Sequence, residues 1–125
     1  MKILKTLAAI TISVTAFTQT SSVNASTFFA WEVTGVEWND TLNARRWPAA
    51  TSQKRAAYPN GTTLSLTGKC KGAPNLLEQI SHLPANVQRA AVMEAKWCEI
   101  WHDPYNNGEF EPGWIYMKYA KPADS

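Results

Sequence analysis

The 125-residue chain is poor in the residues that usually build catalytic and metal sites. It has two histidines, His82 and His102, and two cysteines, Cys70 and Cys98. It contains no zinc-binding spacing, phosphate-binding loop or dinucleotide fingerprint. No turn motif that carries a nucleophile accompanies His102-Asp103, so we expect His102 to be a surface residue of a loop. The sequence therefore predicts no enzyme, no cofactor and no metal.

The sequence also gives little support for a pair of catalytic carboxylates that would cleave glycosides. Glu109 and Glu111 stand two positions apart, so on a strand they would share a face. A deep sugar cleft is hard to form in a domain of about 100 residues. We therefore expect a short acidic loop at this position.

Long apolar runs are absent after the first 25 residues. Lys2 and Lys5 precede an apolar run from Leu7 to Phe17, and Val23-Asn24-Ala25 offers small residues to a signal peptidase. The run is shorter than the ~20 residues that span a membrane, which favours a signal peptide over a retained anchor. We expect residues 1–25 to be a signal peptide, with export to the periplasm or the extracellular space and no membrane span after cleavage.

The chain also lacks an excess of one charge. It has 12 Lys and Arg against 10 Asp and Glu, and without the leader's Lys2 and Lys5 the two signs balance. Because proteins that neutralise phosphates usually keep a basic excess, we expect no nucleic-acid partner. One stretch is basic throughout, with Arg45, Arg46, Lys54, Arg55, Lys69 and Lys71 uninterrupted by acids. Such a run is either a solvated face or a patch for an anionic partner such as a wall peptide.

Two cysteines in an exported chain predict one disulfide. Cys70 and Cys98 would close a loop of about 28 residues, which the chain-entropy model values at roughly 3 to 3.5 kcal/mol. The alternative, a reactive or metal-binding pair, lacks a Cys-x-x-Cys spacing and a neighbouring histidine cluster.

Most of the remaining pattern is typical of strands. β-branched residues and alternation predict strands over 31–37, 62–67, 97–101 and 113–116. We expect Leu42, Leu64, Leu66, Ile100 and Ile115 in the core, and Trp97, Glu99 and Trp101 on the opposite face of their strand. The segment 40–48 is expected to leave regular structure. Residues 72–96 instead contain good helix formers, and Pro74 and Pro84 suit first helical turns. We expect helices over about 74–81 and 84–95.

Four spaced motifs connect these elements to a known family. They are Asp40-x-Leu42-Asn43-x-Arg45 followed by Pro48, Gly61-Thr62-x-Leu64, Trp97-x-x-Ile100 and Gly113-Trp114-Ile115. In combination they resemble the bacterial Src-homology-3-like (SH3b) domain over residues 31–70 and 97–119. The resemblance implies a mainly β fold, a small five-stranded barrel over residues 26–125. The helical hairpin at about 72–96 would be an insert where the family has a short turn, with the disulfide at its base.

The resemblance also implies a function. Domains of this family are mostly non-catalytic binding modules of the cell envelope, and many hold peptidoglycan or its peptides. The alternative is a protein-protein interaction or inhibitor domain that binds an envelope protein through its helical insert.

The expected ligand-binding residues are aromatic or basic: Arg45, Arg46, Trp47, Tyr105 and Trp114. Arg45 ends the Asp40 motif and Arg46 and Trp47 follow it, all on the expected first long loop, and Tyr105 lies on the loop expected to oppose it. An aromatic floor with an arginine at its rim suits a peptide that ends in a carboxylate. Trp47 could instead pack beside Pro48, and Trp114 could be core rather than groove wall.

Overall fold

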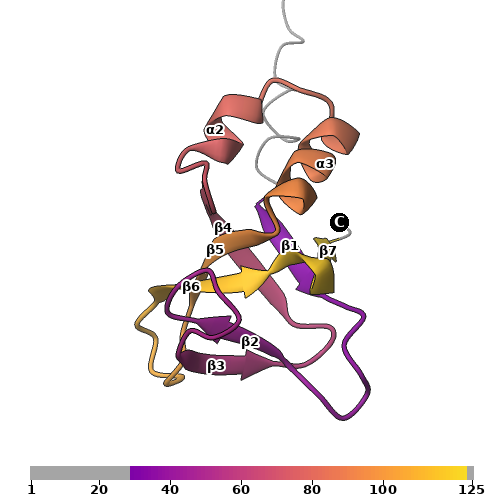
Figure 1. Cartoon of the computed structure of the whole chain (residues 1–125). Coiled ribbons are helices and arrows are strands. Elements are labelled where there is room, and N and C mark those ends of the chain that lie inside the picture. Colours follow the sequence, from indigo (N-terminus) through magenta and orange to yellow (C-terminus); the bar gives the residue numbers. More distant parts are fainter. Residues whose placement is uncertain (1–28, 124–125) are drawn as a thin grey trace, which may run out of the picture.

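The computed structural model describes residues 29–123, so the predicted signal peptide lies outside the described residues. The described part contains seven strands, two α-helices and one 3₁₀ turn (Figure 1). In chain order these are β1 (Ala30–Val33), β2 (Leu42–Arg45), β3 (Lys54–Tyr58), β4 (Thr63–Cys70), α2 (Leu76–Ile80), α3 (Ala85–Ala95), β5 (Trp97–His102), β6 (Glu111–Tyr116), η1 (Met117–Tyr119) and β7 (Ala120–Pro122).

All seven strands belong to one antiparallel sheet. Their order is β3-β2-β6-β5-β4-β1-β7, so β3 and β7 are its two edges. The prediction of a mainly β fold is confirmed. The expected five-stranded barrel is not confirmed, because the sheet has seven strands and is not closed.

The predicted core residues are buried. Leu64 and Leu66 point inward from β4, and Ile100 and Ile115 point inward from β5 and β6. Leu42, from the Asp40 motif, joins them in the same cluster. Period-two alternation therefore assigned the faces of these strands correctly.

Three expectations about the first half of the chain were wrong. The first strand ends at Val33 instead of residue 37, because Gly35 adopts a φ of +74° that extended strands do not allow. Residues 42–45 form β2, although 40–48 was expected to be irregular. Strand β3 was not predicted, because it is an edge strand whose burial shows no simple alternation.

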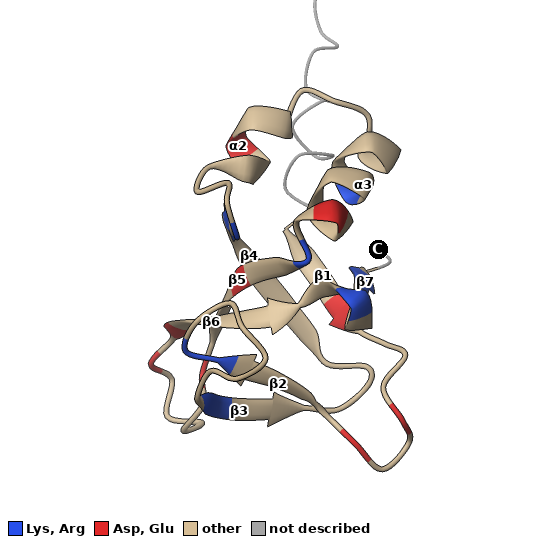
Figure 2. Cartoon of the chain, viewed as in Figure 1, with Lys and Arg blue, Asp and Glu red and all other residues tan. Residues whose placement is uncertain are grey.

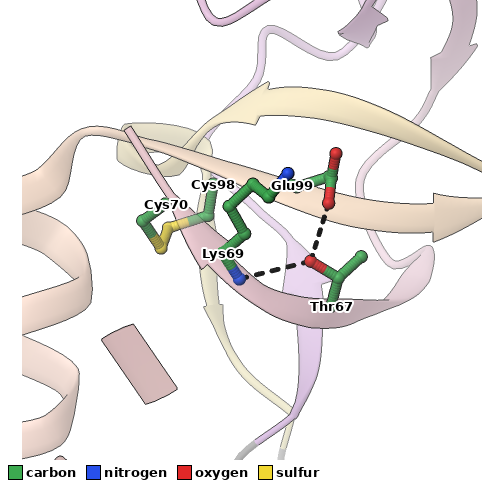
Figure 3. Close-up of a disulfide and its surroundings, with 5 residues drawn as sticks. All are labelled: Thr67, Lys69, Cys70, Cys98 and Glu99. Atoms are coloured by element: carbon green, nitrogen blue, oxygen red, sulfur yellow. Dashed lines mark hydrogen bonds between the residues drawn. A yellow bond between two sulfur atoms is a disulfide. The ribbon is translucent and has the colours of Figure 1, made fainter. Parts of the chain in front are cut away.

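The two helices lie in sequence between β4 and β5, as predicted, and we call this helical segment the insert. They lie together at one end of the sheet (Figure 1). Leu77, Ile80 and Val92 pack into the main core, so the insert also completes the interior of the domain. The Cys70–Cys98 disulfide is confirmed, and the two cysteines are directly opposite partners on β4 and β5 (Figure 3). The bond therefore joins the two ends of the insert.

Strand β4 bulges just before the disulfide. Three residues of β4 separate Leu66 from Cys70, whereas only Glu99 separates their partners on β5. Gly68 accommodates this with a φ of +111°. The Thr67 hydroxyl donates a hydrogen bond of 3.0 Å to Glu99 and accepts one of 3.2 Å from the Lys69 amide (Figure 3). These bonds replace part of the interrupted ladder.

The expectation that His102 is a surface loop residue was wrong. His102 ends β5 with its side chain inward and is 1% exposed. Its Nδ1 shares a hydrogen bond of 2.7 Å with the Tyr58 hydroxyl, while its Nε2 has no partner among the described residues. A Cβ atom on Gly113 would lie 2.6 Å from this Nε2, so the ring occupies space that only a glycine leaves free.

Burial lowers the pKa of the His102 imidazole below its ordinary value of 6.5. Arg55 lowers this pKa further, whereas Glu111 and Asp103 partly oppose the change; the raised pKa of Tyr58 keeps its hydroxyl neutral in this range. The unfolded chain therefore binds a proton at a higher pH than the native protein does. We predict that His102 makes the free energy of unfolding fall as the pH drops below about 6.5.

Nuclear magnetic resonance titration of the His102 ring carbon signal measures this directly. The midpoint should lie below 6.5. A midpoint at or above that value would show that the neighbouring carboxylates outweigh burial.

Candidate functional site

Four of the five predicted ligand-binding residues come together around β2 and β6. Arg45 on β2 is the direct cross-strand partner of Trp114 on β6. Arg46 and Trp47 follow in the next loop, where the Arg46 guanidinium lies 5.7 Å from the centroid of the Trp47 ring. Tyr105 is exposed in the β5–β6 loop and lines none of the three cavities described below.

Arg46, Trp47 and Trp114 line a cavity of about 300 Å³, together with Arg55, Glu99, Glu111 and Pro112; we call it the arginine cavity. Trp114 is 9% exposed but lies outside the main core cluster, so it is a nearly buried wall of this cavity. Trp47 is 61% exposed, so its side chain is not part of the packed interior. Arg55 is held by Glu111 at 2.8 Å, the one ion pair in the described part of the chain.

A second and larger cavity, of about 560 Å³, lies between the β1–β2 loop and the end of β6. Its aromatic wall is formed by Trp97, Tyr116 and Tyr119, and we call it the tyrosine groove. The Trp97 and Tyr116 ring centroids are 5.3 Å apart, and those of Tyr116 and Tyr119 are 6.2 Å apart. Its other lining residues are Gly35, Val36, Glu37, Asp40, Thr41, Leu42, Asn43, Arg45 and Ala50.

The rim of the tyrosine groove is acidic on the side of the β1–β2 loop. This loop carries Glu37 and Asp40 and no Lys or Arg (Figure 2). Trp38, between them in sequence, is 91% exposed. Arg45 is the one basic side chain of the lining, and its Nη1 donates a hydrogen bond of 2.7 Å to the carbonyl oxygen of Ser52.

The tyrosine groove and the arginine cavity are neighbours on the same face of the sheet. Trp97 is the cross-strand partner of Tyr116, and Glu99 is the partner of Trp114. Residues two apart on a strand share a face. The Trp97–Tyr116 pair of the groove therefore lies directly beside the Glu99–Trp114 pair of the cavity. Arg45, opposite Trp114, lines the groove and links the two spaces. Together they offer one extended surface with Glu37 and Asp40 at one end and, at the other, Arg46 beside Glu99 and the Arg55–Glu111 ion pair.

The sequence-based reasoning missed the residues of the tyrosine groove. A signal was present, because alternation had placed Trp97 and Glu99 on the face opposite the core. Tyr116 and Trp114 follow the same rule on β6, so four non-core residues marked this face. What the sequence did not show is that the β1–β2 loop returns beside η1 and encloses the space.

A third cavity of about 340 Å³ lies at the open end of the sheet. Tyr58 and the buried His102 form part of its lining, and the exposed rings of Trp101 and Phe110 stand at its margin. Because His102 Nε2 is directed at Gly113 on β6, this nitrogen is not accessible to a ligand in the cavity.

Two features are absent from residues 29–123. No three His, Cys, Asp or Glu side chains gather to hold a metal ion, and no helix is long and apolar enough to cross a membrane. Comparison of the chain with models of protein families, with curated proteins and with solved structures finds no match. The site must therefore be interpreted from its own geometry.

Proposed function

We propose that the protein is a non-catalytic binding module of the cell envelope that holds a peptide, first of all a peptide of peptidoglycan. The observation that carries the proposal is the continuous surface formed by the tyrosine groove and the arginine cavity. Extended grooves with aromatic walls and a few charged groups at their ends are typical of peptide recognition. The disulfide is consistent with the oxidising compartment that an envelope protein would occupy.

The relationship to SH3b domains is part of the same proposal. It is supported by the short helical turn η1 before a final strand and by the burial of Leu42 from the Asp40 motif. On this view the domain is an SH3b-like barrel that is left open and carries a helical hairpin as an insert.

Co-sedimentation with purified cell-wall sacculi tests the proposal. We expect wild-type protein to sediment with the sacculi and Trp47→Ala to sediment less, because an exposed ring loses contact area with the ligand only. The thermal melt of Trp47→Ala should match that of wild type. Binding should also weaken as salt rises, because Arg46 is exposed and its attraction to a carboxylate is screened.

Phe110→Ala is the control, because it also removes an exposed aromatic side chain and lines neither the groove nor the arginine cavity. It should sediment like wild type. If wild-type protein stays in solution, the wall-binding function is wrong and a protein partner becomes the leading candidate. If the two variants lose binding equally, the contact surface is not the arginine cavity.

A further inference from the structure

We propose that the tyrosine groove binds a positively charged primary amine on an alkyl chain, such as the side-chain amine of a diamino acid in a wall peptide. This inference rests on the proposed function for the nature of the ligand, and it adds the charge and the orientation of that ligand. The expectation from sequence was a carboxylate held by arginine. The structure assigns carboxylate binding to the arginine cavity alone and assigns the larger tyrosine groove to a positively charged group.

The aromatic wall is the first argument. Trp97, Tyr116 and Tyr119 converge on one cavity with neighbouring ring centroids 5.3 and 6.2 Å apart. The faces of such rings carry negative charge and attract ammonium groups. Tyr119 already makes this kind of contact within the protein, because Lys118 Nζ lies 5.7 Å from its ring centroid.

The second argument is the charge of the opposite rim. Glu37 and Asp40 both line the groove from the β1–β2 loop, and neither is in an ion pair with any described residue. An Asp40 oxygen accepts a hydrogen bond of 2.7 Å from the Thr41 amide, which orients that carboxylate. The one basic lining residue, Arg45, directs Nη1 to the Ser52 carbonyl instead. An ammonium group in the groove would thus meet two carboxylates that have no ion-pair partner, against the single positive charge of Arg45 in the same lining.

The third argument is size and position. A cavity of about 560 Å³ accommodates much more than one ammonium group, so the alkyl chain can lie along the rings. Arg46, which has no ion-pair partner among residues 29–123, lies at the other end of the same face and suits a terminal carboxylate. The ligand therefore lies with its amine against the β1–β2 loop and its carboxylate near Trp47.

Two small probes, one with a free side-chain amine and one with that amine acetylated, test the proposal. Nα-acetyl-lysine amide keeps the side-chain amine, and Nα,Nε-diacetyl-lysine amide neutralises it. In ¹H–¹⁵N spectra of the labelled protein, we expect the first probe to shift the amide signals of residues 35–43, Tyr116 and Tyr119, and the second to shift none of them. Equal shifts with both probes, or none with either, would overturn the proposal.

Charge variants locate the binding. The double variant Glu37→Gln with Asp40→Asn should raise the dissociation constant of the free-amine probe about tenfold, as expected for two partly exposed charge contacts. Glu109→Gln is the control, because it removes a carboxylate in the β5–β6 loop that lines none of the three cavities. An unchanged constant in the double variant, or an equal loss in the control, would contradict the assignment to this rim.

Sacculi whose free amines have been acetylated separate this inference from the proposed function. If both are right, acetylation should greatly reduce sedimentation of the protein. Sedimentation that persists after acetylation contradicts the amine as the wall's contact group but leaves wall binding intact. Binding of the free-amine probe by a protein that ignores untreated sacculi would uphold the amine site and refute the wall ligand.

Discussion

Replacing Cys70 and Cys98 together by alanine is expected to lower the free energy of unfolding by about 3 kcal/mol. The bond closes a loop of 28 residues in the unfolded chain, and its removal frees that loop. It also joins opposite residues of β4 and β5 at the base of the insert, just beyond the bulge at Gly68. A thermal melt followed by circular dichroism should show a fall of about 4 to 8 °C for each kcal/mol lost.

The double alanine variant avoids leaving a single reactive thiol. Wild-type protein treated with a reducing agent under native conditions serves as the comparison, because it changes no residue. Both samples should melt at similarly lowered temperatures. A variant that melts like the oxidised wild type would show that the β4–β5 hydrogen bonds alone hold the ends of the insert together.

Replacing Leu42 by alanine is expected to cost about 2 to 5 kcal/mol, as for other buried leucines. Leu42 is 5% exposed and belongs to the main core cluster. It also lines the tyrosine groove, so its loss should loosen the β1–β2 loop against the sheet. Chemical denaturation measures the change in unfolding free energy.

Val87→Ala is the matched control, because it shortens an aliphatic side chain on the exposed face of α3. Its unfolding free energy should change by less than about 0.5 kcal/mol. If Leu42→Ala lowers the unfolding free energy no more than this control does, the packing of Leu42 in the core contributes little to stability.

Strand faces, helices and disulfide were predictable because each depends on local pattern or on a count. Leu64 and Leu66 alternate with hydroxyl residues, which assigns their face without any knowledge of the partner strand. Two prolines and a run of helix formers indicated the insert. With only two cysteines in the chain, one pairing was possible.

Other features depend on the neighbours that a residue meets in space. Strand β3 carries little pattern of its own and forms because β2 offers it a backbone edge. Alternation puts His102 on the inward face of Cys98 and Ile100, but the predicted strand stopped one residue earlier, at Trp101. The space for its ring comes from Gly113 on the next strand and its hydrogen bond from Tyr58 on β3.

The candidate site divides in the same way. The sequence by itself determined that Arg46 and Trp47 lie together, because they are adjacent. It left Trp114 open as core or groove wall, and the pairing of β2 with β6 placed that ring beside them. Only the tertiary structure decided that Glu37 and Asp40 face Trp97, Tyr116 and Tyr119 across one cavity. The physical reason is that a loop's path depends on its closing contacts. Here the Thr34 amide donates a hydrogen bond of 2.9 Å to the Tyr119 carbonyl, which ties the start of the loop to η1.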